Sequence, residues 1–221
     1  MLKPRGIISF VFDDGYSEIM SEALPLFEKY GFRATVAVPV NAKKVVVPPN
    51  TSVLSLDTWK DYCAKKGHEL AAHGLSHVPL PSLSDEQIQK ELKESKEKTN
   101  ATTLIYPGGA FDKRVKEISS QYFSAARTTK RGWENLPPKD FFALNTFNAS
   151  RNNFSVLKWN LWALKAYWGN KWLIETYHHV NQANELHSVQ LHSLESHLRF
   201  IRHLPVRFAT IAEVASTYQT K

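Results

Sequence analysis

The segment IISFVFDDG, residues 7–15, decides how the rest of the chain is interpreted. Its first six residues are nearly all apolar and rich in branched and aromatic side chains, which predicts a short buried β-strand. The Asp-Asp-Gly that follows predicts a turn, because aspartate and glycine favour the backbone conformations that turns require. The sequence therefore predicts a buried strand whose end carries two adjacent carboxylates, Asp13 and Asp14.

Segments that predict strands alternate with segments that predict helices along the whole chain. Strands are expected at residues 7–12, 33–40, 68–73, 102–106, 122–128, 171–177 and 206–209. Helices are expected at residues 18–30, 56–66, 84–98, 112–121, 155–167, 194–203 and 211–218, and residues 129–153 show only turn residues and weak periodicity. Alternation of this kind is typical of right-handed β-α-β crossovers and a parallel sheet. Seven or eight such units in 221 residues indicate a single-domain α/β barrel.

The composition excludes several other classes of protein. The chain is 43% hydrophobic with one cysteine, so it has enough apolar residues for one core and no internal disulfide. No apolar run reaches the roughly 18 residues of a membrane span. The net charge is +7, but the basic residues are scattered among acidic ones, so we expect no nucleic-acid partner. No obligate protein partner is evident.

As written, the sequence begins without a signal peptide and predicts a cytoplasmic protein; a removed targeting segment would make it secreted or periplasmic.

Polar residues fall where the expected strands end. They are Asp13 and Asp14, His73 and His77, the turn at residues 106–109, Arg127 and His178. Because the carboxyl ends of parallel barrel strands form one rim, where the active sites of such barrels lie, this distribution predicts an enzyme.

Three of these residues predict a catalytic metal site. His73 and His77 stand four residues apart in HGLSH, where Gly74 favours a compact loop. Such a pair is common by chance, and Asp-Gly is common in surface turns, so neither is specific alone. Together with Asp14 they form a set of three ligands with open positions, which is the pattern of a catalytic metal rather than a structural one.

The motifs FDDG at residues 12–15, HGLSH at residues 73–77 and YPGG at residues 106–109 resemble, in order and spacing, the first three motifs of the polysaccharide deacetylase family (the NodB-homology domain, carbohydrate esterase family four). The resemblance spans residues 6–216 and is closest to the Tyr-Pro-x-Gly branch. It implies a distorted (β/α)₇ TIM-like barrel, with residues 1–221 as one catalytic domain. It also implies metal-dependent hydrolysis of N-acetyl groups on glycans that contain amino sugars, with release of acetate.

The resemblance also implies roles for individual residues. Asp14, His73 and His77 match the ligands of a divalent metal, usually zinc. Asp13 matches the general base that takes a proton from the attacking water. The turn formed by Tyr106, Pro107, Gly108 and Gly109 matches the substrate and oxyanion site, with the Gly108 N–H as the expected donor.

The sequence defines the general acid, and the cation beside the general base, less clearly than the metal ligands. His178 ends an apolar strand and is the favoured general acid, whereas His179 and His192 remain alternatives. Many family members carry an arginine two residues before the proline of the third motif, and this chain has Ile105 there. Arg127, at the end of the next expected strand, is our candidate for the missing cation. The remaining histidines, His68, His187, His197 and His203, are interpreted as structural or surface residues.

The tryptophans in the second half of the chain could pack in the core or form a platform for a sugar ring. Trp159, Trp162, Trp168 and Trp172 are assigned mostly to the core, whereas Trp133 in the irregular segment is the better candidate for a sugar platform. Two alternative functions stay open. One is the same metal chemistry on O-acetyl esters or a small amide; the other is a barrel that binds glycan without catalysis.

Overall fold

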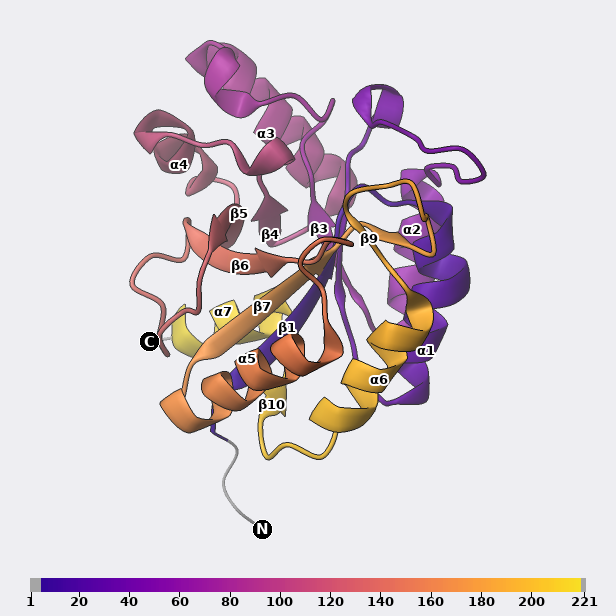
Figure 1. Ribbon diagram of the computed structural model, residues 1–221. Coiled ribbons are helices and arrows are strands. Elements are labelled where there is room, and N and C mark those ends of the chain that lie inside the picture. The colour runs from indigo at the N-terminus through magenta and orange to yellow at the C-terminus, as the bar shows by residue number, and fades with distance from the viewer. Residues whose placement is uncertain (1–4, 220–221) are drawn as a thin grey trace.

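The computed structural model describes residues 5–219. Its centre is a barrel of seven parallel strands that follow one another in chain order and surround one interior (Figure 1). They are β1 (Ile7–Phe12), β2 (Thr35–Val38), β3 (Glu69–Ala72), β4 (Thr103–Ile105), β5 (Ala125–Arg131), β6 (Leu144–Asn148) and β7 (Trp172–Tyr177). β1 pairs with β7 along its whole length and closes the barrel. The predicted single-domain (β/α)₇ barrel is therefore confirmed.

The barrel is distorted around β1. The first residues of β1 pair with the short strand β10 (Arg207–Phe208), while only its last two residues, Val11 and Phe12, pair with β2. β3 and β4 are joined through a single residue pair, Ala72 with Leu104. The pairs that β1 makes with β2 and β3 makes with β4 thus lie at the carboxyl ends of β1 and β3, and residues 73–77 follow directly after β3.

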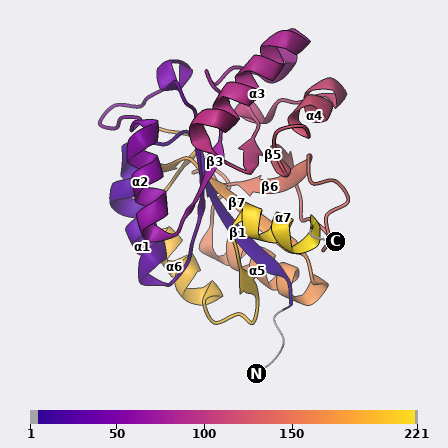
Figure 2. The same ribbon diagram turned by 180° about the vertical axis from the view of Figure 1, so that it is seen from behind.

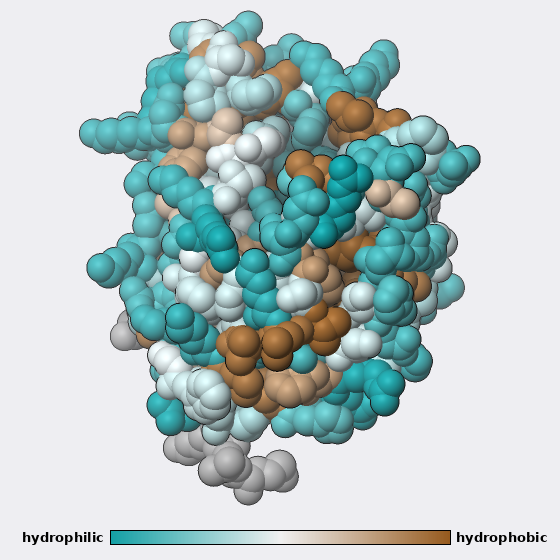
Figure 3. Space-filling view, in the orientation of Figure 1, coloured by the Kyte–Doolittle hydropathy of each residue, from teal (hydrophilic) through white to brown (hydrophobic). Residues whose placement is uncertain are grey.

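Helices cover the outside of the barrel (Figures 1 and 2). They are the π-helix η1 (Ile19–Ala23) and the α-helices α1 (Leu24–Lys29), α2 (Leu56–Lys66), α3 (Asp85–Thr99), α4 (Lys113–Ser119), α5 (Val156–Gly169), α6 (Leu191–Ile201) and α7 (Ile211–Gln219). Figure 3 shows an apolar band where Figure 1 draws α5, and this helix carries the exposed residues Leu157 and Leu161. Within residues 5–219, no helix combines the length and apolar character needed to cross a bilayer.

The alternation of β1 determines where its side chains point. Ile8, Phe10 and Phe12 pack with the surrounding helices, whereas Ile7 and Val11 belong to the interior cluster of the barrel. Because side chains alternate along a strand, Asp13 continues the inward-facing row at the carboxyl end. The sequence of β1 thus fixes one carboxylate at the mouth of the barrel.

The opposite end of the barrel is closed by α7. Its apolar residues Ile211, Val214 and Ala215 pack against the inward side chains of the strands. The N–H groups of Ile211 and Ala212 donate to Thr35 Oγ1 at 3.2 Å and to Glu69 Oε2 at 3.0 Å, at the beginnings of β2 and β3. The carboxyl end is therefore the open one.

Several element boundaries differ from the sequence-based expectation. β6 lies inside residues 129–153, where we predicted no element, because its alternation is interrupted by the polar residues of LNTFN. β5 runs over Ala125–Arg131 rather than residues 122–128. The helix expected at residues 18–30 begins as a π-helix; Pro25, which lacks the N–H needed for regular bonding, follows it in the first turn of α1.

Candidate active site

A pocket of about 350 Å³ opens at the carboxyl ends of the strands. It is lined by Asp13, Asp14, His73, His77, Tyr106, Gly108, Gly109, Arg127, Thr129, Asn148, His178 and His187. The structure thus brings together every site residue that the sequence singled out except Pro107. Pro107 is buried within the turn and approaches Gly74, where a Cβ atom would lie 3.1 Å from the proline ring.

Asp14, His73 and His77 form a compact group of donor atoms. The Nε2 atoms of His73 and His77 lie 3.3 and 3.1 Å from Asp14 Oδ1. Asp14 Oδ1 is buried and makes no well-aligned hydrogen bond with any described residue, so these atoms converge on a common point instead of bonding to one another. All three donor atoms lie within 4.8 Å of one another. One carboxylate and two imidazoles could hold a divalent transition metal.

The backbone at two of these residues adopts an uncommon conformation. Asp14 has φ of 70° and His77 has φ of 53°, both in the left-handed region. Non-glycine residues adopt this conformation at a cost and persist in it where the surrounding structure holds them, often at functional sites. Both aim a side chain at the shared point.

Neighbouring groups orient the two histidines. His73 Nδ1 lies 2.8 Å from the carbonyl oxygen of Ile105, which leaves Nε2 free to face the pocket. The loop that carries His77 is held by Glu91 of α3, whose carboxylate accepts hydrogen bonds from the backbone N–H groups of Leu75 at 2.9 Å and Ser76 at 3.1 Å and from the Ser76 hydroxyl at 2.5 Å. Outer contacts of this kind fix the orientation of metal ligands.

Asp13 is paired with Arg127 inside the pocket. Arg127 Nη2 lies 2.6 and 2.5 Å from the two carboxylate oxygens, and both side chains are almost fully buried. Burial disfavours the charged form of Asp13, but the Arg127 guanidinium, with smaller contributions from His178 and His73, outweighs it and lowers the pKa of Asp13. The pKa of Asp14 is also lowered, because the imidazoles of His73 and His77 overcome its desolvation.

The register of two strands accounts for the position of Arg127. Ile105 of β4 pairs with Arg127 of β5, so the two residues are direct neighbours at the same height in the barrel. Ile105 packs in the barrel interior. The family resemblance places an arginine at the position of Ile105, on β4. In this chain the guanidinium that faces Asp13 comes from Arg127 on the neighbouring strand, β5.

Of the three candidate acids, His178 is the one in the pocket. Its Nε2 lies 3.5 Å from Asp13 Oδ2, and its Nδ1 is buried with no hydrogen-bond partner among residues 5–219. Burial lowers the pKa of His178, and the nearby carboxylates of Asp13 and Asp14 offset this only in part.

The other two candidates point elsewhere. His179 Nδ1 contacts Glu18 Oε1 at 2.9 Å, in the short strand β8 (His179–Val180). His192 is not at a strand end: the strand β9 (Ser188–Val189) stops before it, and His192 lies in the first turn of α6, where Nε2 contacts the Ser193 hydroxyl.

The turn at residues 106–109 forms one wall of the pocket. Gly108 and Gly109 have φ of 61° and 69°. A Cβ atom on Gly109 would lie 2.3 Å from Thr129 Oγ1, so only glycine fits there. The N–H groups of Gly109 and Ala110 donate back into the turn at 2.8 and 3.3 Å, whereas Gly108 lines the pocket. Tyr106 is buried, and its hydroxyl donates to the Phe142 carbonyl oxygen at 3.1 Å.

His187 also lines the pocket, although the sequence did not single it out as a site residue; it is exposed, in agreement with its interpretation as a structural or surface residue. Its ring centroid lies 5.1 Å from that of His178. The loop that carries it has no periodic pattern, so only a search for histidines near the expected acid would have singled it out. The loop is braced by Arg151, whose backbone N–H and Nη1 donate to the carbonyl oxygens of Leu186 and Ala183 at 2.9 and 3.1 Å.

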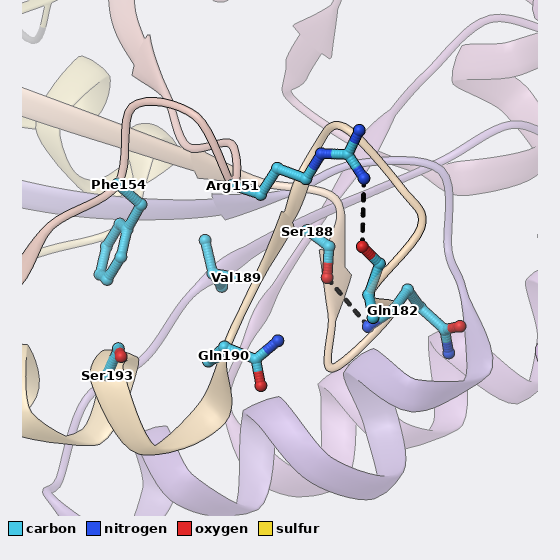
Figure 4. A pocket seen from close by; sticks show the side chains of 8 residues that line it. Arg151, Phe154, Gln182, Ser188, Val189, Gln190 and Ser193 are labelled. Carbon is cyan, nitrogen blue, oxygen red and sulfur yellow. Dashed lines mark hydrogen bonds between the residues drawn. The ribbon is translucent and has the colours of Figure 1, made fainter.

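Figure 4 shows Arg151 and its side-chain contact beside a separate, smaller pocket of about 120 Å³. Its lining includes Arg151, Gln182 and Ser188, and the Gln182 N–H donates to the Ser188 hydroxyl at 2.9 Å. None of the predicted site residues lines it, so we interpret it as part of the support for the His187 loop.

Trp133, the predicted platform, lies outside the active-site pocket. Its ring packs 4.6 Å from that of Phe147, and its Nε1 donates to the Trp162 carbonyl oxygen at 3.4 Å. Trp159 and Trp172 are fully buried as expected, Trp162 is partly buried, and Trp168 is 65% exposed.

The sequence comparison identifies the family. Residues 3–123 match the family model described as polysaccharide deacetylase, which is more than half of the chain. The chain belongs to the polysaccharide deacetylase family. The matched region contains Asp13, the three candidate metal ligands and the turn at residues 106–109, but it ends before Arg127 and His178.

One curated relative is the Bacillus subtilis protein named "Putative polysaccharide deacetylase YxkH", which is 26% identical over 132 residues. That alignment covers 57% of this chain and 45% of the relative, so the chain spans less than half the length of this relative.

Solved structures show the same fold over nearly the whole chain. The Xyl-CE4 domain of a multidomain xylanase from the hindgut metagenome of Trinervitermes trinervoides has a TM-score of 0.66 at 19% identity, covering 98% of this chain and 93% of the domain. The Bc1960 peptidoglycan N-acetylglucosamine deacetylase has a TM-score of 0.60 at 14% identity, covering 96% and 91%. At these identities the likeness concerns the fold.

Proposed function

We propose that this chain is a metal-dependent deacetylase that hydrolyses N-acetyl groups on glycans containing amino sugars and releases acetate. The observation that carries the proposal is the pocket in which three candidate metal ligands lie beside a buried carboxylate, Asp13, and a histidine, His178. Its three sequence motifs and its family membership agree with this function. We place the chain in the Tyr-Pro-x-Gly branch on the basis of residues 106–109.

Asp14, His73 and His77 would hold the metal. A bound divalent metal would lower the pKa of water and polarise the acetyl carbonyl. Asp13 takes the proton of the attacking water, and Arg127 keeps Asp13 ionised and fixes the direction of its carboxylate. The Gly108 N–H donates a hydrogen bond to the oxygen on which negative charge develops.

His178 completes the reaction by donating a proton to the leaving nitrogen. The C–N bond of the amide breaks after the C–O bond has formed, and the products are acetate and a free amine. His178 Nε2 lies 3.5 Å from Asp13 Oδ2, and this short distance supports the proposal that the two residues act together as acid and base. A proton collected by Asp13 therefore has a short route to the departing amine.

The test is acetate release from N-acetylglucosamine oligomers, by metal-stripped protein with and without added zinc. Asp13→Asn is the matched variant, because it keeps the size of the side chain and removes the base. We expect zinc-dependent release that falls by about 100-fold or more in the variant, while zinc affinity is retained. Acetate release that does not require metal, or that survives in Asp13→Asn, would refute the mechanism.

The three candidate acids are separated by His178→Asn, His179→Asn and His192→Asn. We expect only the first to abolish turnover with zinc binding intact, because His179 is paired with Glu18 and His192 lies on α6. Full activity in His178→Asn would transfer the role to another group.

Acetyl esters are the second candidate substrate. A fold neighbour from a multidomain xylanase favours including acetylated xylan in the same assay. Acetate release from acetylated xylan alone would support the same metal chemistry with an acetyl ester as the substrate. Tight zinc binding without release from any acetylated substrate would favour a non-catalytic, glycan-binding barrel.

A further inference from the structure

A second hollow lies beside the active-site pocket, and the proposed reaction does not use it. Its volume is about 160 Å³, and it is lined by Thr129, Arg131, Phe147, Asn148, Asn153 and Trp162. Thr129 and Asn148 also line the active-site pocket, so the two hollows share a wall. A sugar unit linked to the one in the active site is therefore within reach of this hollow.

Arg131 is held in this hollow by aromatic rings. Its guanidinium carbon lies 4.9 Å from the centroid of the Trp162 ring and 5.5 Å from that of Phe147. The two rings pack 4.2 Å apart and form one platform. Stacking on a ring fixes a guanidinium in place without using its N–H donors. Arg131 is exposed, and within residues 5–219 no hydrogen bond or ion pair involves its side chain, so its donors are available to a ligand in the hollow.

Two lysines reinforce the positive charge here. Lys158 Nζ lies 5.2 Å from the Trp162 centroid, and Lys165 Nζ lies 4.9 Å from the Trp133 centroid. Neither pairs with a carboxylate in the described part of the chain. On α3, in contrast, Lys90 and Lys93 face glutamates one turn away. The charge beside the hollow is therefore locally uncompensated and favours an anionic ligand.

Asn148 supplies a separate polar group at the junction of the two hollows. Its Oδ1 atom is buried and receives no hydrogen bond from residues 5–219. A buried acceptor without a donor is costly, so a ligand hydroxyl or amide placed there would stabilise the site.

We propose that this hollow is a subsite for a sugar unit that carries a carboxylate, such as a uronic acid, linked to the N-acetylated sugar in the active site. Arg131 binds the carboxylate through two parallel N–H donors, and Asn148 accepts a hydrogen bond from a hydroxyl of the same glycan. The proposal rests on the proposed deacetylase function and names an acidic glycan as its substrate class.

The test compares two tetrasaccharides with identical linkages. One alternates N-acetylglucosamine with glucuronic acid; in the other, reduction of each carboxyl has converted the glucuronic acid to glucose. We expect the wild-type protein to favour the acidic glycan by about tenfold in kcat/KM, since hydrogen bonds to a charged group discriminate at least to this extent. In Arg131→Gln we expect the preference to vanish through a higher KM, with kcat unchanged.

Lys130→Gln is the matched control. It removes the same charge from the adjacent residue, whose Nζ lies over the Phe111 ring at 4.8 Å and outside the hollow. The control should keep the preference, because the effect depends on the position of Arg131 rather than on net charge. Loss of the preference in both variants to the same degree would overturn the subsite in favour of general charge attraction.

Calorimetry of the binding of both glycans to the metal-free protein distinguishes the subsite proposal from the deacetylase proposal. Acetate release from the neutral glycan without any preference for the acidic one overturns the subsite and retains the deacetylase. Tighter binding of the acidic glycan that requires Arg131, without acetate release from either glycan, retains the subsite and overturns the deacetylase. A preference that persists in Arg131→Gln overturns the role of Arg131.

Discussion

The Arg127–Asp13 ion pair is the most constrained contact between single residues in the pocket. Both side chains are almost fully buried, so removal of either one leaves a charge without compensation. The cost of such a change is about 3–5 kcal/mol of stability. The pair therefore links the stability of the barrel to the ionisation of the proposed base.

Arg127→Met should reduce kcat by about 100-fold, the lower range of what general-base catalysis contributes, because Asp13 loses its orientation and its favourable charge partner. Steady-state kinetics would measure the effect, with circular dichroism to show that the variant is folded. Arg127→Lys keeps the charge but not the planar guanidinium and should retain an intermediate rate. Unchanged kinetics in a folded Arg127→Met protein would dismiss the role.

His68 makes stability depend on pH. Its Nδ1 accepts a hydrogen bond from the Ala34 N–H at 3.1 Å, and burial lowers its pKa despite the nearby Glu28. Below about pH 6.5 the unfolded chain gains a proton at this residue that the folded protein does not accept, so the free energy of unfolding falls as the pH falls. Stability from this residue is thus present above pH 6.5 and is lost below it.

Urea unfolding at pH 7.5 and pH 5.5 should show a smaller decrease for His68→Gln than for the wild-type protein. His203→Gln, at an exposed position, is the control and should behave like the wild-type protein. An equal decrease in all three proteins would exclude His68 as the source.

At the scale of elements, one helix supports the loop that carries two of the candidate metal ligands. The loop at residues 73–77 carries two of the three candidate ligands, and Glu91 of α3 accepts three hydrogen bonds from it. A loop with this little regular structure depends on such contacts for its conformation. The third candidate ligand, Asp14, lies in the turn after β1.

Glu91→Gln should weaken zinc binding by about 10-fold to 100-fold, as is typical when an outer contact of a metal ligand is removed. An amide lacks one acceptor oxygen and therefore cannot replace all three bonds. Zinc affinity would be measured by competition with a chelator. Glu97→Gln, on an exposed face of the same helix, should leave the affinity unchanged; a similar loss in both variants would count against the loop contact.

The π-helix η1 gives the adjacent residues His178 and His179 different surroundings. Glu18, at its beginning, accepts a short hydrogen bond from Thr51 and contacts His179. β8 is thereby fixed against η1, which directs His179 away from the pocket and leaves His178 facing Asp13.

At the scale of the whole molecule, stability comes from burial on both sides of the barrel wall. Trp172 of β7 is fully buried in the barrel interior, and its Nε1 donates to the Ser9 hydroxyl of β1 at 2.8 Å. This contact joins the two strands that close the barrel. Trp168, four residues earlier in the chain, is 65% exposed on α5.

Trp172→Ala should lower the free energy of unfolding by about 3–5 kcal/mol, because it leaves a cavity at the closure and removes the hydrogen bond to Ser9. Trp168→Ala is the matched control and should change it by about 0.5 kcal/mol or less. Chemical denaturation would measure both. Similar losses in the two variants would contradict the assignment of Trp172 to the core.

The sequence predicted the barrel because most of its strands and helices have clear periodicity. It did not predict β6, whose residues alternate too weakly, although β6 contributes Asn148 to the pocket and Phe147 to the aromatic platform. It also did not single out His187 as a pocket residue, and Trp133, its candidate sugar platform, lies outside the pocket. Both lie in segments without periodicity, where contacts distant in sequence decide the position of a side chain.

By itself, the sequence determined the family, the inward direction of Asp13 and the set of candidate metal ligands, since these follow from local motifs and from alternation along single strands. Only the tertiary structure decided which histidine faces Asp13. It also decided that Arg127, the strand neighbour of Ile105, pairs with Asp13, and that Arg131 stacks on aromatic rings without a carboxylate partner among the described residues. These outcomes depend on the register between strands and on packing between elements far apart in the chain. No local pattern of residues encodes such distances.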